Sequence, residues 1–346
     1  MDNWGEDLKK IIASIAFLAI SNICVGQESV EFRHDILDGV QPWVHDNFDA
    51  ADDKFTFAVF SDLTGGERPR IFEIAVAQLS LLRPELIMNV GDLVEGGTED
   101  LGEIDRQRDS FDKRASRANA PVFYVGGNHD LTGEVLQRTW DERYGRRYYH
   151  FIYKDVLFLI LDTEDNTPER TQKIHELHSA AREVGQSEGF EAFRQTEYAN
   201  LPENLGGNIT AEQSSYFQNV LADNPEVRWT FLFMHKAPWV REDEKNFTAL
   251  EAAMADRPYT VFHGHLHAYR YAERLGRDYI QLGTTGGVHL RDPQGRAVDH
   301  ITLVTVDNSG VDIANLLMSG ILDKTGHIPL DGDDVCFETA VCGGDN

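Results

Sequence analysis

Short apolar runs alternate with amphipathic segments along the chain after residue 54. Three of the runs are strand-like, at 55–60, 86–90 and 122–127. Between them, residues 70–82 have apolar positions at helical spacing, and 104–118 form a charged helical stretch. Repetition of strand, helix and strand predicts a parallel sheet with right-handed crossovers. We therefore expect an α/β fold.

A polar stretch at 165–209 interrupts this pattern. The strand-like runs 149–153 and 156–164 precede it, and helical pieces are predicted inside it at 171–184 and 189–198. A segment of this length within a compact domain is either a functional flap or a solvated insertion, and the pattern leaves both open.

The alternation resumes after the polar stretch. A helix begins near Thr210, with Thr210 and Gln213 as a capping-box pair. The further elements expected are a strand at 227–235, a helix at 247–255, a strand at 259–267, and antiparallel-looking strands at 267–271, 279–282, 299–306 and 311–317.

Polar residues stand where the strand-like runs end. They are Asp62, Asp92, Asn128, His235, His265 and His267. Ligands of such sheets bind at the carboxyl ends of the strands, so we expect these residues to converge. Aspartates, an amide oxygen and imidazoles suit zinc, iron or manganese better than calcium, and Asp92 could bridge two ions. A single histidine is more often a satisfied, partly buried ring, but this many elements in order make chance a poor explanation.

Composition narrows the class of function. The chain has 346 residues, 41% of them hydrophobic, which is enough for a sizeable core. Its formal net charge of −26 argues against nucleic acid and anionic membranes as partners, because their phosphates would be repelled. A phosphate substrate would need a metal centre to offset the same repulsion. Solubility is the simpler reason for the acidity.

The amino terminus has the features of a targeting segment. Two lysines precede the apolar run 11–20, after which the sequence becomes polar. This predicts a signal peptide at 1–26 and a secreted or periplasmic location. The run is short for a membrane span, although an uncleaved anchor is an alternative. Residues 27–54 would be an amino-terminal extension.

The carboxyl terminus, 321–346, is predicted to be an acidic tail. It contains Cys336 and Cys342, the two cysteines left after signal removal. In an exported protein we expect them to form a disulfide.

The polar motifs resemble those of the calcineurin-like metallophosphoesterase family, with a more distant resemblance to purple acid phosphatases and related phosphodiesterases. The family pattern is D-x-H, G-D-x-x, G-N-H-[DE], H and G-H-x-H. Its counterparts here are Gly91-Asp92, Gly127 to Asp130, His235, and Gly264 to His267. The resemblance implies a four-layer α/β/β/α sandwich with two central mixed sheets. The domain would span 55–320, with 165–209 as a helical insertion.

The same resemblance implies two divalent or trivalent ions, of zinc, manganese or iron. The ligands that it carries over are Asp92, Asn128, His235 and His265 for metal 2, and Asp62, Asp92 and His267 for metal 1. Metal 1 would also take the histidine of D-x-H, but Thr64 stands in that position. Metal 1 is therefore expected to lack one imidazole.

Glu95, three residues after Asp92, is the candidate to compensate. Purple acid phosphatases place a metal-binding tyrosine at this offset, and serine/threonine phosphatases a carboxylate that orients the G-N-H histidine. We favour the second role. Glu95 or Asp130 would pair with His129 and raise its pKa, and His129 would donate a proton to the leaving group. A solvated loop glutamate is the plain alternative.

Substrate contacts are predicted on loops beside these motifs. Arg68 could clamp a phosphate, and Thr284 and His289 could line the pocket from a glycine-rich turn. A solvent-facing arginine and an ordinary tight turn are equally consistent with the sequence. Side chains of the insertion could cover the site, although surface decoration is favoured for them; they are His175, His178, Tyr198 and Asn200.

The predicted function is hydrolysis of a small phosphomonoester, phosphodiester or nucleotide by a metal-bound hydroxide. The alternative is a catalytically weak metal- or phosphoryl-binding protein with a degenerate metal 1 site, which the presence of Thr64 motivates. Neither nucleic acid nor, after signal cleavage, a membrane is expected as a partner. The sequence does not indicate an oligomeric state.

Overall fold

The computed structural model describes residues 52–290 and 294–338, which contain two mixed β-sheets. The four-stranded sheet has the order β10-β9-β1-β2, and the six-stranded sheet the order β3-β4-β5-β6-β8-β7. Strands β1 and β2 are parallel, as are β4, β5, β6 and β8 in sequence across the larger sheet. The strands are β1 (Phe55–Phe60), β2 (Leu86–Asn89), β3 (Tyr149–Tyr153), β4 (Val156–Ile160), β5 (Trp229–Phe233), β6 (Tyr259–His263), β7 (Arg270–Arg274), β8 (Arg277–Gln281), β9 (His300–Asp307) and β10 (Gly310–Leu317).

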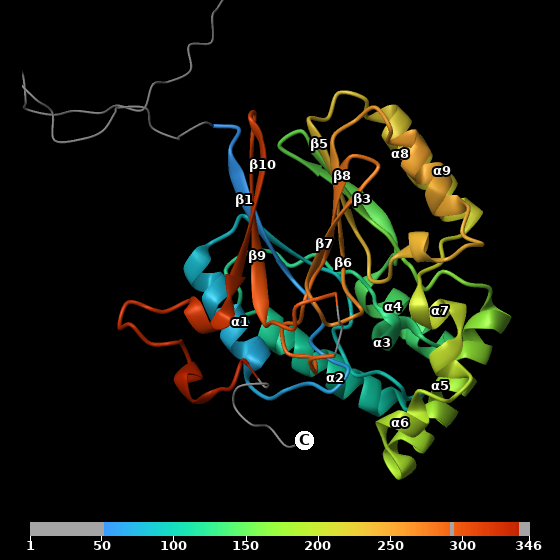
Figure 1. Ribbon diagram of the computed structural model, residues 1–346. Coiled ribbons are helices and arrows are strands. Elements are labelled where there is room, and N and C mark those ends of the chain that lie inside the picture. Colours follow the sequence, from blue (N-terminus) through green and yellow to red (C-terminus); the bar gives the residue numbers. More distant parts are fainter. Residues whose placement is uncertain (1–51, 291–293, 339–346) are drawn as a thin grey trace, which may run out of the picture. The chain divides into compact units, whose positions relative to one another are not determined.

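Helices cover the outer faces of both sheets, which gives the predicted four layers (Figure 1). Helices α1 and α2 pack on the four-stranded sheet, and α8 and α9 on the six-stranded sheet. The helices are α1 (Ile71–Leu82), α2 (Leu101–Ala115), α3 (Asn128–Leu131), α4 (Glu134–Tyr144), α5 (Pro168–Glu188), α6 (Phe190–Phe193), α7 (Pro202–Leu205), α8 (Ala211–Asp223) and α9 (Asn246–Ala253). The α/β/β/α prediction is confirmed.

The alternation of side chains along β1 explains how the two sheets stack. Phe55, Phe57 and Val59 face the layer between the sheets, whereas Ala58 and Phe60 face the helical layer of α1 and α2. The ring of Phe57 lies edge-on to Phe231 of β5, with 4.9 Å between centroids. Each such buried phenylalanine contributes about 1.5–3 kcal/mol. This apolar layer holds β1 against β5, so both strands end at the same side of the domain.

The prediction of a strand at 122–127 is wrong. Only Val122 forms a bridge, with Ile87 of β2. After Val122, the side-chain amide of Asn89 forms the hydrogen bonds that a neighbouring strand would otherwise form with the backbone. Its Nδ2 donates to the Phe123 carbonyl at 2.7 Å, and its Oδ1 accepts from the backbone N–H of Val125 at 3.1 Å. The segment runs beside β2 without regular strand geometry.

The insertion is closed at its base by one carboxylate. Thr210 caps α8 as predicted, accepting from the Gln213 N–H at 3.2 Å. The reciprocal half of the capping box is replaced, because the Thr210 N–H and the Gln213 amide both donate to Asp165. Asp165 stands at the start of the insertion and Thr210 just after its end, so these bonds hold the two ends together.

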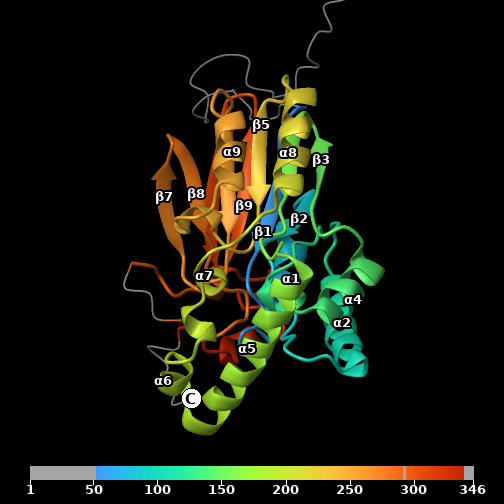
Figure 2. The same cartoon turned by 90° about the vertical axis from the view of Figure 1, so that its right-hand side faces the viewer.

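The insertion lies beyond the carboxyl ends of the strands and not against a sheet face, as Figures 1 and 2 show for α5 and α6. Helix α5 is longer than predicted because Thr167 caps it and Pro168 occupies its first turn, where proline is favoured. The second predicted piece, 189–198, is only the short α6 followed by a 3₁₀ turn at Tyr198–Asn200.

The predictions for the chain ends fall largely outside the described residues. This applies to the signal peptide at 1–26 and to Cys342; Cys336 is disulfide-bonded. No helix within 52–290 and 294–338 is both long and apolar enough to cross a membrane. Part of the predicted tail packs beneath α1, where Ile328 and Phe337 are buried in its apolar cluster.

Replacing Asn89 by alanine should lower the free energy of unfolding by about 2–4 kcal/mol, because buried N–H and C=O groups lose their partner. Urea denaturation measures this change. Ser215→Ala, which removes a hydroxyl on the exposed face of α8, should change it by less than about 0.5 kcal/mol. Equal stability of the two variants would contradict the role given to Asn89.

His300 on β9 should make the fold sensitive to acid. Burial lowers its pKa to about 4, and its Nε2 accepts the Gly283 N–H at 2.9 Å, which requires an unprotonated nitrogen. The unfolded chain takes up the proton near pH 6.5, so stability is full above that pH and is lost as the pH falls towards 4.

The loss attributable to His300 is on the order of 3 kcal/mol. Comparing urea midpoints of the wild type and His300→Gln at pH 7, 5.5 and 4.5 measures it. The variant should lose less stability than the wild type across this range. Parallel curves would show that His300 does not carry the effect.

Candidate metal centre

The predicted metal ligands meet at the carboxyl ends of β1, β2, β5 and β6. Two sets of side chains have potential ligand atoms within 4.8 Å of one another. One set is Asp92, His235 and His265, and the other is Asp62, Asp92 and His267. Asp92 belongs to both. The Oδ1 of Asn128, the first residue of α3, lies 3.0 Å from Nε2 of His235 and so joins the first set.

Glycines in the motifs are required by the close approach of backbone to these carboxylates. A Cβ atom on Gly127 would lie 2.2 Å from Oδ1 of Asp92, and one on Gly264 would lie 2.3 Å from Oδ2 of Asp62. Neither contact is sterically possible. The glycines of G-N-H and G-H-x-H therefore make room for the ligands.

Three of the ligand residues have a left-handed backbone conformation. The φ angles are 56° at Asp92, 74° at His265 and 52° at His267. Each costs roughly 1–2 kcal/mol for a residue with a side chain. Such strain collects at functional sites, where the surrounding structure holds it in place.

Backbone carbonyls fix the direction of each imidazole. Nδ1 of His235 lies 2.8 Å from the Val90 carbonyl, and Nδ1 of His267 lies 2.6 Å from the Val288 carbonyl. In both rings Nε2 is thereby turned to the carboxylates. His265 is held the other way, with Nε2 at 2.7 Å from the carbonyl of Asn204 in α7. These contacts are the outer-shell bonds that orient metal-binding histidines.

The electrostatics of the site favour a bound cation. Asp62 and Asp92 are fully buried, and burial raises the pKa of Asp62. Burial also acts on Asp92, but His235 and His129 outweigh it and lower its pKa far below the usual range. Burial lowers the pKa of His235, but the Asp92 carboxylate more than offsets this effect. The pKa of His235 is therefore raised to about 9. The two carboxylates thus favour a positive charge where the two sets of ligands converge, and a metal ion would supply a larger charge than a proton. The residues fit the predicted metals.

Thr64 does not substitute for the missing histidine. Its hydroxyl is fully buried and donates to the carbonyls of Val94 at 3.0 Å and Asp92 at 3.3 Å. The side chain therefore joins the loop after β1 to the loop after β2.

Glu95 contacts His129, but not through its carboxylate as predicted. Its backbone carbonyl lies 2.8 Å from Nδ1 of His129. The carboxylate instead accepts the N–H groups of Gly66 at 3.0 Å and Glu67 at 2.8 Å. Two turn amides pointing at one oxygen hold it away from the role of a metal 1 ligand. A backbone contact has no residue signature, so sequence reasoning could not find it.

Asp130 is not the partner of His129 in this structure. Its carboxylate accepts backbone N–H groups of Leu93 at 3.1 Å, Val94 at 3.2 Å and Gly127 at 2.8 Å. Burial raises its pKa to about 7. The residue anchors the G-D loop to the G-N-H turn.

The three predicted substrate-binding residues come together, but in an internal network. Arg68 forms an ion pair with buried Asp299, and it donates to Thr284 at 3.3 Å and to the Gly287 carbonyl at 3.0 Å. Nε2 of His289 lies 3.5 Å from Asp299. The guanidinium charge is already compensated, so the network supports the loop whose Val288 carbonyl orients His267. Asp299, which sequence reasoning missed, directly precedes β9 and belongs to no recognisable motif.

A buried ion pair behind His235 was also missed. Nζ of Lys236 lies 2.7 Å from Glu164 and donates to the Glu203 carbonyl at 2.8 Å. Both side chains are almost fully buried. The bond to Glu203 connects the end of β5 to the insertion.

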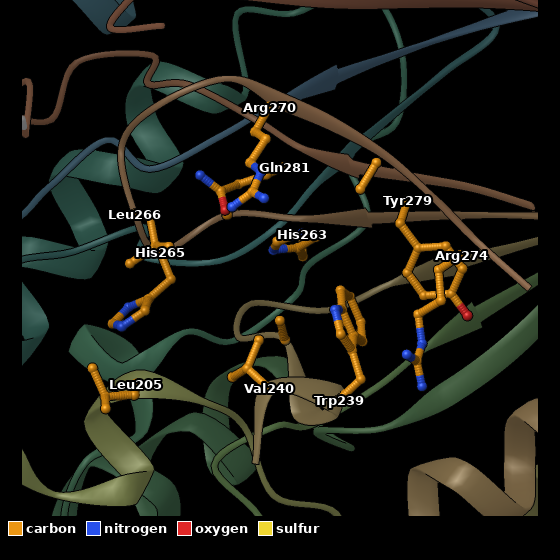
Figure 3. Close-up of a pocket in the computed structure, with 13 residues that line it drawn as sticks. Leu205, Trp239, Val240, His263, His265, Leu266, Arg270, Arg274, Tyr279 and Gln281 are labelled. Carbon is orange, nitrogen blue, oxygen red and sulfur yellow. The ribbon is translucent and has the colours of Figure 1, made fainter. Parts of the chain in front are cut away.

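A cavity of about 220 Å³ borders the centre at His265. Trp239 and Tyr279 form aromatic walls, with 4.8 Å between their ring centroids. Figure 3 shows the His265 ring at one end of the cavity, turned away from Trp239. Arg270 and Gln281 add polar groups to the lining.

Comparison with known proteins places this site in a family. A sequence profile of the calcineurin-like phosphoesterases matches residues 55–269. The chain therefore belongs to the calcineurin-like phosphoesterase family and is a metallophosphoesterase. Among proteins with curated descriptions, no sequence matches.

The solved structures similar to this chain are distant from it in sequence. A purple acid phosphatase from yellow lupin (Lupinus luteus) seeds is 14% identical, with a TM-score of 0.51, over 78% of this chain and 52% of its own. This chain thus spans about half of that protein. PhoD is 11% identical, with a TM-score of 0.50, over 78% of this chain and 67% of its own. A dimetal phosphatase from Danio rerio is 14% identical over 76% and 98%, with a TM-score of 0.47.

The variants Glu95→Gln and Glu95→Ala separate the roles considered for Glu95. Glutamine keeps an oxygen for the Gly66 and Glu67 amides, so hydrolysis of p-nitrophenyl phosphate and metal content should stay within about threefold of wild type. Alanine leaves both amides without their partner and should lower activity about tenfold or more by displacing His129. If the charge of the carboxylate were needed by a metal or by His129, Glu95→Gln would be as damaged as Glu95→Ala.

Proposed function

We propose that this protein hydrolyses a small phosphomonoester, phosphodiester or nucleotide at a centre of two metal ions. The observation that carries the proposal is the pair of ligand sets that share Asp92 at the carboxyl ends of the strands. A bridging carboxylate between two sets is the arrangement used in two-metal hydrolysis. Membership of the family supports the reaction class.

The ligand roles follow from the contacts. Metal 2 would be held by Asp92, Asn128, His235 and His265, and metal 1 by Asp62, Asp92 and His267. Nδ1 of His265 would be its ligating atom, because Nε2 contacts Asn204. Zinc, manganese and iron all suit this set. When bound, such ions lower the pKa of water and neutralise phosphoryl oxygens.

His129 is placed to handle the leaving group. Its backbone N–H donates to Asp92 at 2.9 Å, which ties the residue to the centre. Its Nδ1 is engaged by the Glu95 carbonyl, so Nε2 is the atom that can give a proton to the leaving-group oxygen. The Glu95 carbonyl holds the ring in that orientation.

Charge and shape support a small substrate. The net charge of −26 opposes binding of long polyanions, whereas one phosphoester needs only the local metal charge. The aromatic cavity at His265 offers room for an organic group. The predicted signal peptide at 1–26 supports a secreted or periplasmic location.

A catalytically weak binding protein is the second candidate, because Thr64 leaves metal 1 one imidazole short of the family pattern. Against it, the four metal 2 ligands and His129 are assembled with their orienting contacts.

Asp92→Asn should reduce bound metal and lower hydrolysis of p-nitrophenyl phosphate by at least about 100-fold, because both sets lose their shared carboxylate. Elemental analysis and steady-state assays after loading with manganese or zinc measure this. The matched control is Asp312→Asn on the exposed side of β10, which should leave both quantities unchanged.

Wild-type protein that binds metal but hydrolyses neither p-nitrophenyl phosphate nor bis-p-nitrophenyl phosphate would favour the binding protein over the hydrolase. An active Asp92→Asn variant with full metal content would remove the ligand assignment.

A further inference from the structure

Helix α5 of the insertion is seated on the loops that carry the catalytic motifs. His175, His178 and Arg182 lie on one side of the helix, and the two histidines are buried. Nδ1 of His175 contacts the Thr132 carbonyl, just after α3, at 3.3 Å. Arg182 donates to the Gly97 carbonyl, two residues after Glu95, at 3.0 Å.

Two glycines allow α5 to pack this closely on the loops. A Cβ atom on Gly97 would lie 1.5 Å from Nη1 of Arg182, and one on Gly133 would lie 2.9 Å from Nδ1 of His175. Both glycines have positive φ angles, of 63° and 113°. The helix therefore packs on backbone that has no side chain in the way, and its position relative to the motifs is defined.

His178 stands between these two anchors and faces His129. The centroids of the two rings are 6.3 Å apart, with an interplanar angle of 78°. Nδ1 of His178 is buried and has no hydrogen-bond partner among the described residues. Burial lowers the pKa of this ring to about 3, with His129, Arg182, His175 and Lys236 acting in the same direction, so it is neutral.

Tyr198, from the same insertion, packs against His178. Its ring lies against His178, with 4.6 Å between centroids, and only 5% of the residue is exposed. Burial raises the pKa of its phenol well above the usual range, and the negative charges of Glu164 and Asp92 act in the same direction. The phenol keeps its proton, and its hydroxyl makes no hydrogen bond within 52–290 and 294–338.

The cations near the centre are engaged elsewhere. Arg68 is paired with Asp299, and Lys236 with Glu164. Nδ1 of His178 is thus a buried polar atom beside His129 without a partner among the described residues, and the ring of Tyr198 lies against the same imidazole. Buried polar atoms are rarely left without a partner, so His178 points to a ligand or ordered water that the Tyr198 hydroxyl could also contact.

We propose that His178 and Tyr198 form a phosphoester-binding pair, which contacts oxygens of the substrate on the His129 side of the centre. This assigns the insertion the role of a substrate-binding wall instead of surface decoration. Neutral donors avoid adding charge to a site where the proposed metal ions would already compensate the phosphate. The inference rests on the proposed function for the identity of the ligand as a phosphoester.

The test uses His178→Gln and Tyr198→Phe in the full chain loaded with manganese or zinc. Calorimetric titration with inorganic phosphate should show affinity weakened about three- to tenfold in each variant, the loss expected for one hydrogen bond. The KM for p-nitrophenyl phosphate should rise by a similar factor, with metal content and melting temperature near wild type.

The chain contains a matched control pair. His150 of β3 contacts the Tyr216 hydroxyl at 2.7 Å, in a histidine–tyrosine pair outside the insertion. His150→Gln and Tyr216→Phe should leave phosphate affinity unchanged. Arg182→Met controls for loosening of α5: a purely structural role for His178 would make His178→Gln and Arg182→Met alike, with lower melting temperatures.

The outcomes separate this inference from the proposed function. The proposed binding role of the pair is wrong if His178→Gln and Tyr198→Phe both keep wild-type phosphate affinity with metal bound. This holds even if the wild type is an active hydrolase. Weakened phosphate binding in both variants supports the pair even if the wild type hydrolyses neither ester, in which case the hydrolase proposal fails alone. A metal-loaded wild type that does not bind phosphate overturns the pair.

Discussion

The burial of two carboxylates, Asp62 and Asp92, at the carboxyl ends of β1 and β2 is the constraint on which the rest of the site depends. A buried negative charge is costly unless cations or hydrogen bonds compensate it. Here the compensation comes from His235 and His267, which are held by backbone carbonyls. The crowding explains why glycine stands at 127 and 264, and why ligand residues adopt left-handed backbone. A site organised in this way favours a bound cation, because a metal ion would offer the two carboxylates more positive charge than the histidines do.

Main-chain contacts, more than side-chain pairs, join the motif loops to one another. Thr64 bonds two carbonyls of the next loop, Asp130 collects three amides, and Glu95 uses its carbonyl towards His129 and its carboxylate towards a turn. The insertion is attached to the same loops through Arg182 and through Asn204, whose carbonyl orients His265. Positioning of the ligands is therefore a property of the loops as a group, and the insertion belongs to that group.

The spacing of apolar residues along the chain predicted most helices and strands, because in those segments the residues at that spacing are the ones that become buried. The run 55–60 became β1 with its predicted bounds, since its alternate residues face two different apolar layers. The run 122–127 looked equally strand-like, but a single buried amide, Asn89, replaced the ladder beside it. Arg68 was interpreted as a phosphate clamp because Asp299, distant in the sequence, has no motif that would reveal the pairing.

The sequence by itself determined the chemistry of the centre, because metal ligands must be particular residue types at the ends of strands. That was enough to name Asp62, Asp92, Asn128 and the three histidines together, and to find the family. Only the tertiary structure decided which nitrogen each ring presents, what Thr64 and Glu95 bond, and where the insertion lies. These properties depend on distances between loops far apart in the chain, and on backbone groups that every residue shares, so no residue pattern encodes them.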